Sequence, residues 1–154
     1  MSTVVVAYDG SPSARKAVEL AVRRTTAEDK LVVVHVYKIP PEWHSLTYYE
    51  DLVERALEQA SAVMDRIEED CPELRGRDWE PDVIEGRPAE VVCRVARHRH
   101  ADEIILGSRG LSALAGLLGS VSHEVLHRAE CPVLIIPEKA VKPQREPATA
   151  GAAS

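Results

Sequence analysis

Between Glu103 and Pro137 the chain reads EIILGSRGLSALAGLLGSVSHEVLHRAECPVLIIP. The apolar run Ile104–Leu106 predicts a buried strand, and the loop Gly107-Ser108-Arg109-Gly110 follows it directly. After eight further residues, Gly119-Ser120 is expected to open a helix, and Val133–Ile136 predicts a last strand. A strand, a loop, a helix and a second strand in this order are the repeating unit of a parallel α/β sheet.

The two glycine clusters of this segment are suited to phosphate groups. Glycine carries no Cβ and tolerates positive φ, so its backbone can approach a phosphate closely. The helix that begins at Gly119-Ser120 adds unpaired N–H groups and a partial positive charge in its first turn. We therefore expect the segment to form one wall of an adenine-nucleotide site.

Composition narrows the class of protein. Of 154 residues, 45% are hydrophobic and 29% are charged, which predicts a single soluble domain. Phenylalanine is absent, so the core must be built from valine, leucine, isoleucine and alanine, as in sheets that are covered on both faces. The net charge of −6 argues against nucleic acid as a partner. With no apolar run long enough to span a bilayer and no CxxC among three cysteines, we expect no membrane partner and a cytoplasmic protein with reduced thiols.

Strands and helices alternate along the rest of the chain. The predicted strands are Thr3–Tyr8, Leu31–Tyr37, Asp82–Glu85, Ile104–Leu106 and Val133–Ile136, and the predicted helices begin at Pro12, about Glu50, Pro88 and Gly119. The second of these helices is expected to bury one apolar stripe, made of Val53, Ala56, Leu57, Ala60, Val63, Met64 and Ile67. This order predicts a doubly wound α/β sandwich with a five-stranded parallel sheet in residues 1–138, followed by a flexible C-terminal tail in residues 139–154.

Two strand ends carry residues that suit a ligand site. In doubly wound sheets the ligand lies outside the carboxyl ends of the strands, where this chain has Asp9-Gly10-Ser11 and Gly107-Ser108-Arg109-Gly110. Asp9 is either a carboxylate that contacts the ligand or a turn residue at the entry of a helix. Arg109 is either a cation for phosphate groups or a solvent-exposed loop arginine.

Four stretches make the chain resemble the universal stress protein family. They are VVVAYDGS (4–11), VHV (34–36), EGRPAE (85–90) and the segment 107–137. Nucleotide-binding members of that family carry G-x2-G-x9-G-[ST], whereas this chain has eight residues between Gly110 and Gly119. The shorter loop either still brings both glycines to the phosphates, with Gly116 supplying conformational freedom, or pulls Gly119 out of reach.

The resemblance implies a flavodoxin-like fold that binds ATP with Mg²⁺ and serves as a stress-response regulator or sensor. It implies that Asp9 contacts the ribose or the water shell of a metal, and that Val36 meets adenine through its backbone. The implied ribose and base pocket is Ala7, Tyr8, Leu106 and Gly107, and the implied phosphate site is Gly110, Gly119, Ser120 and Ser122, with Arg109 and Val121 beside them. Ser120 is also the expected N-cap of its helix, and serine hydroxyls can donate to phosphate oxygens.

The sequence offers little for catalysis. It lacks G-x4-G-K-[ST] and G-x-S-x-G, and no general base is placed by a motif, so we expect at most slow, incidental ATP hydrolysis. The resemblance also implies a homodimer, formed through the last strand as an open sheet edge: Val133, Leu134, Ile135 and Ile136. The alternative is a dimeric interaction module of the same family that binds no nucleotide.

One motif suggests different chemistry. His123-Glu124-Val125-Leu126-His127 spells H-E-x-x-H, the helical zinc signature of metalloproteases. The same helix is expected to turn Val121, Val125 and Leu126 toward the sheet, which leaves the histidines facing solvent. No third ligand follows on a companion helix, so a zinc protease is not expected.

Overall fold

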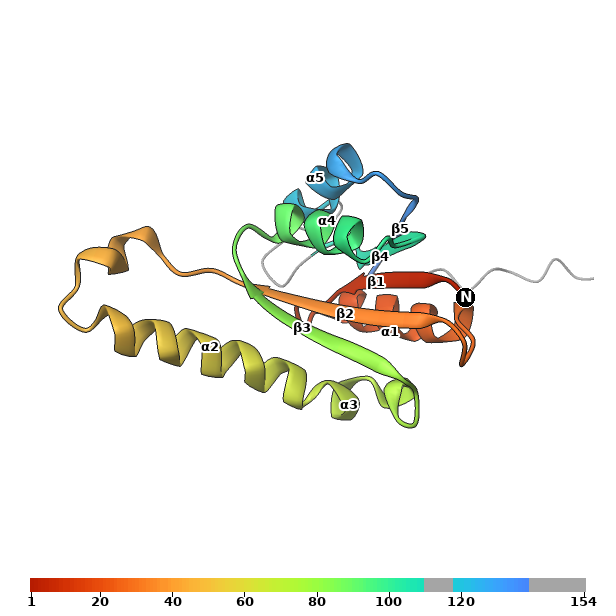
Figure 1. Ribbon diagram of the computed structural model, residues 1–154, viewed down its shortest axis with the longest axis horizontal. Coiled ribbons are helices and arrows are strands. Elements are labelled where there is room, and N and C mark those ends of the chain that lie inside the picture. The colour runs from red at the N-terminus through yellow and green to blue at the C-terminus, as the bar shows by residue number, and fades with distance from the viewer. Residues whose placement is uncertain (110–117, 139–154) are drawn as a thin grey trace, which may run out of the picture.

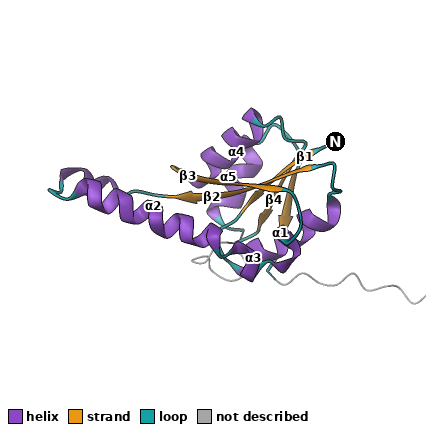
Figure 2. Ribbon diagram, turned by 60° about the horizontal axis from the view of Figure 1, so that its bottom comes forward, coloured by secondary structure: helices purple, strands orange, loops and turns teal. Residues whose placement is uncertain are grey.

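The computed structural model describes residues 1–109 and 118–138, and it shows a five-stranded parallel sheet with helices on both faces (Figures 1 and 2). The strands are β1 (Thr3–Ala7), β2 (Lys30–Tyr37), β3 (Trp79–Glu85), β4 (Glu103–Gly107) and β5 (Val133–Ile136). The helices are α1 (Pro12–Arg24), α2 (Tyr49–Asp65), α3 (Ile67–Asp70), α4 (Pro88–His98) and α5 (Ser120–Arg128), with short 3-10 helices η1 (Pro41–Ser45) and η2 (Pro72–Leu74). The predicted doubly wound, flavodoxin-like α/β class is confirmed. Gly110 and the predicted tail, residues 139–154, lie outside the described residues.

The order of strands in the sheet is β3-β2-β1-β4-β5, and all neighbours are parallel. The chain therefore builds outward from β1 through β2 to β3, and then crosses back to β4 and β5. Val5, in the middle of β1, pairs with Val32 on one side and with Ile104 on the other. The direction of winding reverses between β1 and β4, which is the switch point where doubly wound sheets hold their ligands.

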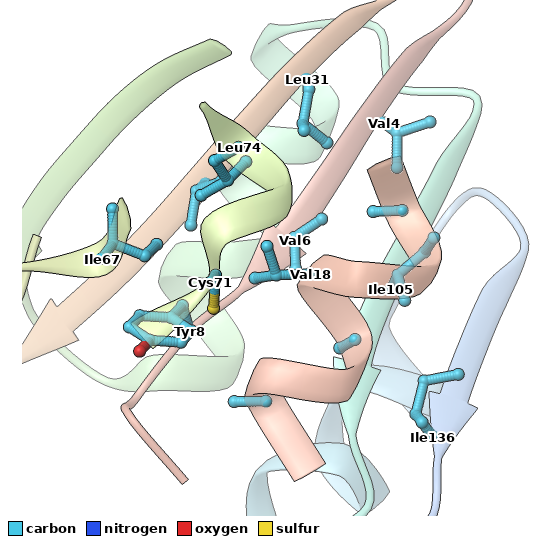
Figure 3. Packing of buried hydrophobic residues seen from close by; sticks show 14 of the residues in the cluster. Val4, Val6, Tyr8, Val18, Leu31, Ile67, Cys71, Leu74, Ile105 and Ile136 are labelled. Carbon is cyan, nitrogen blue, oxygen red and sulfur yellow. The ribbon is translucent and has the colours of Figure 1, made fainter. Parts of the chain in front are cut away.

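Alternate residues of β1 belong to two separate hydrophobic layers. Val4, Val6 and Tyr8 pack with α1, α2 and α3 on one face of the sheet (Figure 3). Val5 and Ala7 pack with α4 and α5 on the other face. Both layers consist largely of aliphatic side chains, as the absence of phenylalanine predicts.

Helix α1 starts where the sequence predicts. Ser11 Oγ accepts a hydrogen bond of 3.2 Å from the N–H of Ala14, and Pro12 fills the first helical position. The buried face of the helix carries small side chains, Ala14, Ala17, Val18 and Ala21. Small residues let the helix lie close to the sheet, which brings its first turn to the ends of β1 and β4.

Helix α2 departs from the prediction in its first half. Of the predicted stripe only Ala60, Met64 and Ile67 are buried, and Leu57 is 44% exposed. The first turns of α2, together with η1, project beyond the sheet (Figure 1), so they have no strands to pack against. The single helix that was expected also breaks at Arg66, which separates α2 from α3.

Candidate functional site

A cavity of about 390 Å³ lies at the carboxyl ends of β1, β2 and β4, within the size range of small-molecule sites. Helices α1, α4 and α5 point their N-terminal ends toward it. The cavity is lined by Ala7, Tyr8, Asp9, Ser11, Ala14, Val34, Val36, Pro88, Val92, Leu106, Gly107, Arg109, Gly119, Ser120, Val121 and Ser122. All predicted site residues except Gly110, which is not described, are in this set. The structure thus brings them together, and their binding of a nucleotide stays a prediction.

The backbone of β2 is left without a partner where β1 ends. The two strands pair as far as Ala7 opposite Val34, and the N–H of Tyr8 still donates to the carbonyl of Val34 (2.8 Å). Backbone groups alternate sides along a strand, so Val36 directs its N–H and C=O to the same side as Val34, beyond the end of β1. The next acceptor in that ladder, the carbonyl of Tyr8, instead accepts a hydrogen bond of 2.8 Å from Nδ1 of His35. Val36 therefore offers the cavity one donor and one acceptor that no described residue occupies.

The ring of Tyr8 points away from the cavity. It is 2% exposed and packs in the layer that contains Cys71 and Ile67 (Figure 3). Its hydroxyl lies 3.4 Å from Oδ2 of Asp70. Burial, more than the nearby charges of Cys71 and Asp70, raises the pKa of Tyr8 above its usual value. Tyr8 therefore lines the cavity with its backbone.

Asp9 closes the turn between β1 and α1. Its Oδ1 accepts a hydrogen bond of 2.9 Å from the N–H of Ser11, and Gly10 between them has a φ of +81°, which favours glycine. The side chain is exposed, and Oδ2 has no hydrogen-bond partner among the described residues. Asp9 is thus a turn residue at the entry of α1, one of the two roles predicted for it, and its Oδ2 stays accessible from the cavity.

Gly107 lets α1 dock directly on the end of β4. A Cβ at Gly107 would lie 2.2 Å from Ser13 Oγ and 2.8 Å from the backbone nitrogen of Ala14. The docking is reinforced two residues later, where the carbonyl of Arg109 accepts hydrogen bonds from the hydroxyls of Ser13 (2.6 Å) and Ser11 (3.3 Å). Helix packing therefore requires glycine at this position, a reason that the sequence alone did not indicate.

The charges that line the cavity balance one another. The guanidinium of Arg109 forms an ion pair with the carboxylate of Glu138, and the Arg109 side chain is only 17% exposed. The alternative of a solvent-exposed loop arginine is therefore wrong. Asp9 and Arg109 are the only charged residues in the described lining. An anion in this cavity would thus depend on oriented N–H groups rather than on an excess of cations.

Gly119 is the N-cap of α5, so the prediction that Ser120 fills this position is wrong. The N–H of Gly119 donates to the carbonyl of Ser108 (2.6 Å), and Ser122 Oγ donates to the same carbonyl (2.8 Å). These bonds hold the start of α5 against the end of β4. Gly119 lines the cavity, which means that the shorter glycine loop does not remove it from the candidate site.

The first turn of α5 presents unpaired donors to the cavity. The first intrahelical hydrogen bond runs from the N–H of His123 to the carbonyl of Gly119 (3.0 Å). The N–H groups of Ser120, Val121 and Ser122 precede it, and none has a partner among the described residues. The hydroxyl of Ser120 is also unpartnered in this part of the chain, whereas that of Ser122 is engaged by Ser108.

Sequence reasoning placed Ser11 at a strand end suited to a ligand but assigned it no role, and it missed four further lining residues: Ala14, Val34, Pro88 and Val92. Ser11 and Ala14 belong to the start of α1, and Pro88 and Val92 to the first turns of α4. The signal that could have found them is topological. Helices that follow parallel strands all begin at the same edge of the sheet, so the first turns beside the switch point converge on one site.

The H-E-x-x-H motif does not form a closed metal centre. Across residues 1–109 and 118–138, no three His, Cys, Asp or Glu side chains converge to hold a metal ion. Glu124 is engaged by Arg128 (2.9 Å) and by Arg87 (3.4 Å). Both histidines are exposed as predicted, but Leu126 is 48% exposed, so its predicted place in the core is wrong. Val125 is fully buried, as expected.

The sheet edge at β5 and the character of the helices bear on protein and membrane partners. Strand β5 lies at an edge of the sheet and pairs with β4 alone among the described strands. Its edge position agrees with the prediction, and dimerisation through it stays a prediction. In the part of the chain that the structure describes, no helix combines the length and the apolar character needed to cross a membrane.

Known proteins resemble the chain over almost its whole described length. The model of the Universal stress protein family matches residues 1–137. A universal stress protein of Thermus aquaticus is 36% identical over 137 residues, which cover 87% of this chain and 97% of that protein. A solved universal stress protein in complex with cAMP is 28% identical, with a TM-score of 0.66 over 88% of this chain and 96% of that one. Universal stress protein UspA from Lactobacillus plantarum, 21% identical, shares the fold with a TM-score of 0.71 over 88% of this chain and 97% of that one. On a match that runs from β1 to β5, the chain belongs to the universal stress protein family.

Proposed function

We propose that this protein binds ATP, with Mg²⁺, in the cavity at the switch point and acts in the cytoplasm as a stress-response regulator or sensor whose partner binding depends on the nucleotide. The observation that carries the proposal is the first turn of α5, where three consecutive N–H groups line the cavity without a partner among the described residues. Donors at a helix start bind phosphate through hydrogen bonds and through the helix dipole. The related structure at 28% identity holds cAMP, which is an adenine nucleotide.

The base would lie on the apolar side of the cavity, with its edge at Val36. The apolar lining is Ala7, Val34, Val36, Val92 and Leu106. Adenine presents the N6 amino group as a donor beside the N1 acceptor, and these match the free C=O and N–H of Val36. Guanine places an acceptor, O6, beside a donor, so the same backbone groups would oppose it. The backbone N–H and C=O of Val36 thus favour adenine over guanine.

The phosphates would extend from Gly107 toward the start of α5. There the N–H groups of Ser120, Val121 and Ser122 and the hydroxyl of Ser120 are available as donors. Mg²⁺ takes oxygen ligands, and the accessible Oδ2 of Asp9 fits that preference together with phosphate oxygens. Asp9 is the one carboxylate in the described lining, and its other oxygen closes a turn. We therefore propose that hydrolysis is slow and incidental.

The proposal is tested by thermal unfolding of the native chain and of a Gly119 variant, each with millimolar ATP and Mg²⁺. A Cβ at Gly119 would lie 3.0 Å from the carbonyl oxygen of Ser108 and 3.3 Å from Cα of Arg109. A large side chain there must therefore push the backbone of Ser108 and Arg109 away and distort the proposed phosphate site. ATP is expected to raise the melting temperature of the native chain and not that of Gly119→Leu, with circular dichroism unchanged. Leu118→Gln, at the exposed neighbour, is the matched control and should respond like the native chain. No response of the native chain would reject the proposal.

The second candidate function is a dimeric interaction module that binds no nucleotide. It is favoured because several donors near the cavity already have partners within the protein and so are not available to phosphate groups. Gly119 and Ser122 both donate to the carbonyl of Ser108, and Arg109 is paired with Glu138. An open β5 edge suits pairing with a second copy in either case. Sedimentation equilibrium at micromolar concentration should show a dimer that Leu134→Lys dissociates. A native chain that stays monomeric would reject the dimeric interaction module.

A further inference from the structure

Two histidines of α5 form a pair that the candidate nucleotide site does not use. His123 and His127 are one helical turn apart, and their ring centroids lie 4.7 Å apart with an interplanar angle of 71°. Both side chains are exposed, whereas Ser122 and Val125 of the same helix are buried. The two imidazoles therefore stand together on the solvent face of α5, with free access for a small ion.

We propose that His123 and His127 together chelate a divalent transition-metal cation such as Zn²⁺, Ni²⁺ or Co²⁺. Imidazole nitrogen is a preferred ligand of these ions. Side chains at positions i and i+4 share one helix face, with Cβ atoms about 5–6 Å apart. Metal–nitrogen bonds of about 2.0–2.1 Å can bridge such a pair after small rotations of exposed side chains. The pair thus supplies two ligands from one face of one helix.

The site is an open one, with the remaining ligands supplied by water. No third protein donor converges on a metal position within the described residues. Glu124, which follows His123 in sequence, is held by Arg128 and Arg87. Two guanidinium groups share this one carboxylate, so Glu124 adds no excess negative charge that would attract a cation. A metalloprotease centre differs because it requires three protein ligands.

A bound metal would stabilise the helix that borders the cavity. Helix α5 has nine residues, and its N-cap Gly119 makes no side-chain capping bond. Helices this short are marginal without outside support. An ion held by His123 and His127 ties the first two turns together, and those turns carry the N–H groups that face the cavity. The metal proposal rests on the histidine pair itself and holds whether or not the cavity binds a nucleotide.

The test is a titration of the full-length, reduced protein with Co²⁺, followed by calorimetry and by absorption spectroscopy. We expect one ion per chain and a spectrum without a thiolate-to-cobalt charge-transfer band. His123→Gln and His127→Gln should each weaken binding by about tenfold or more, because a chelate becomes a single ligand. Glutamine favours helix, so circular dichroism should be unchanged. His98→Gln, at an exposed histidine on α4, is the matched control and should bind like the native chain.

Two results would overturn the proposal. One is equal affinity of the native chain, His123→Gln and His127→Gln. The other is a thiolate band that disappears in Cys131→Ser, since Cys131 is half-buried and is the most accessible of the three cysteines. Thermal unfolding gives an independent readout, because Ni²⁺ should raise the melting temperature of the native chain and not that of His127→Gln.

Discussion

Nδ1 of His35 donates a hydrogen bond of 2.8 Å to the carbonyl oxygen of Tyr8. A carbonyl can only accept, so Nδ1 carries the proton. The same carbonyl is the acceptor that the N–H of Val36 would meet if β1 and β2 continued to pair. His35 therefore holds the carbonyl of Tyr8 at the point where the two strands stop pairing and the backbone of Val36 faces the cavity, although the His35 side chain is not in the cavity lining.

Replacing His35 by alanine should weaken ATP binding without unfolding the protein. Without that bond the carbonyl of Tyr8 can turn toward the N–H of Val36, which would remove the donor proposed for adenine. We expect calorimetry to show an affinity lower by about tenfold, equivalent to about 1.4 kcal/mol. His35→Gln keeps a donor and should lose less, and His44→Ala, at an exposed site, should lose nothing. Full affinity in His35→Ala would show that the bond to Tyr8 does not shape the site.

Two serines of the first turn of α5 should behave in opposite ways. Ser120 is exposed and its hydroxyl has no described partner, so Ser120→Ala should reduce ATP affinity several-fold and leave stability unchanged. Ser122 is 2% exposed and donates to the carbonyl of Ser108, so Ser122→Ala should lower the free energy of unfolding by about 1 kcal/mol. Urea unfolding and calorimetry on both variants separate the two roles. A reversed pattern would mean that Ser122, and not Ser120, contacts the phosphates.

Gly107→Ala should destabilise the fold itself. The new methyl group would meet Ser13 Oγ at 2.2 Å and the backbone of Ala14 at 2.8 Å, so α1 must move off the sheet. Overpacking of this kind costs about 2 kcal/mol, measurable as a lower urea midpoint. The double variant with Ser13→Ala should recover only part of the loss, because the backbone contacts remain. A midpoint equal to that of the native chain would show that α1 does not lie this close to β4.

Alkaline pH should destabilise the protein through the buried Tyr8–Cys71 contact. Burial raises the pKa of the Cys71 thiol from 9.0 to about 11, against a smaller lowering by its hydrogen bond with Tyr8. The folded state then binds more protons than the unfolded chain between these values. The free energy of unfolding should therefore fall as pH rises from about 9 to about 11. Cys71→Ala should flatten this slope in part, because burial also raises the pKa of Tyr8. A slope that is the same in both proteins would exclude Cys71 as its cause.

Much of the fold follows from local sequence signals. Ser11-Pro12 and the β-branched runs act within a few residues, and the structure places α1, β1 and β2 accordingly. The first half of α2 could not be predicted this way. A helical apolar stripe shows which face is hydrophobic, but the extent of the sheet decides how much of that face is covered. The first turns of α2 project beyond the sheet (Figure 1), and Leu57 of the predicted stripe is 44% exposed.

In the candidate site too, local sequence signals predicted some features, and contacts between distant segments decided the others. Family motifs pointed to the residues that meet at the cavity, because a glycine at a strand end is visible in sequence. The physical reason for Gly107 was not visible, since it lies in Ser13, which is distant in the chain. Nor could the sequence show that Gly119 rather than Ser120 caps α5, because the cap depends on the contact with Ser108.

Calorimetric titration of the purified native chain with ATP and Mg²⁺, alongside GTP and Mg²⁺, tests the central claim most directly. The account predicts one ATP bound per chain, with GTP bound at least about tenfold more weakly because its base edge opposes Val36. No heat and no thermal shift at millimolar ATP would contradict it, as would equal affinity for the two nucleotides.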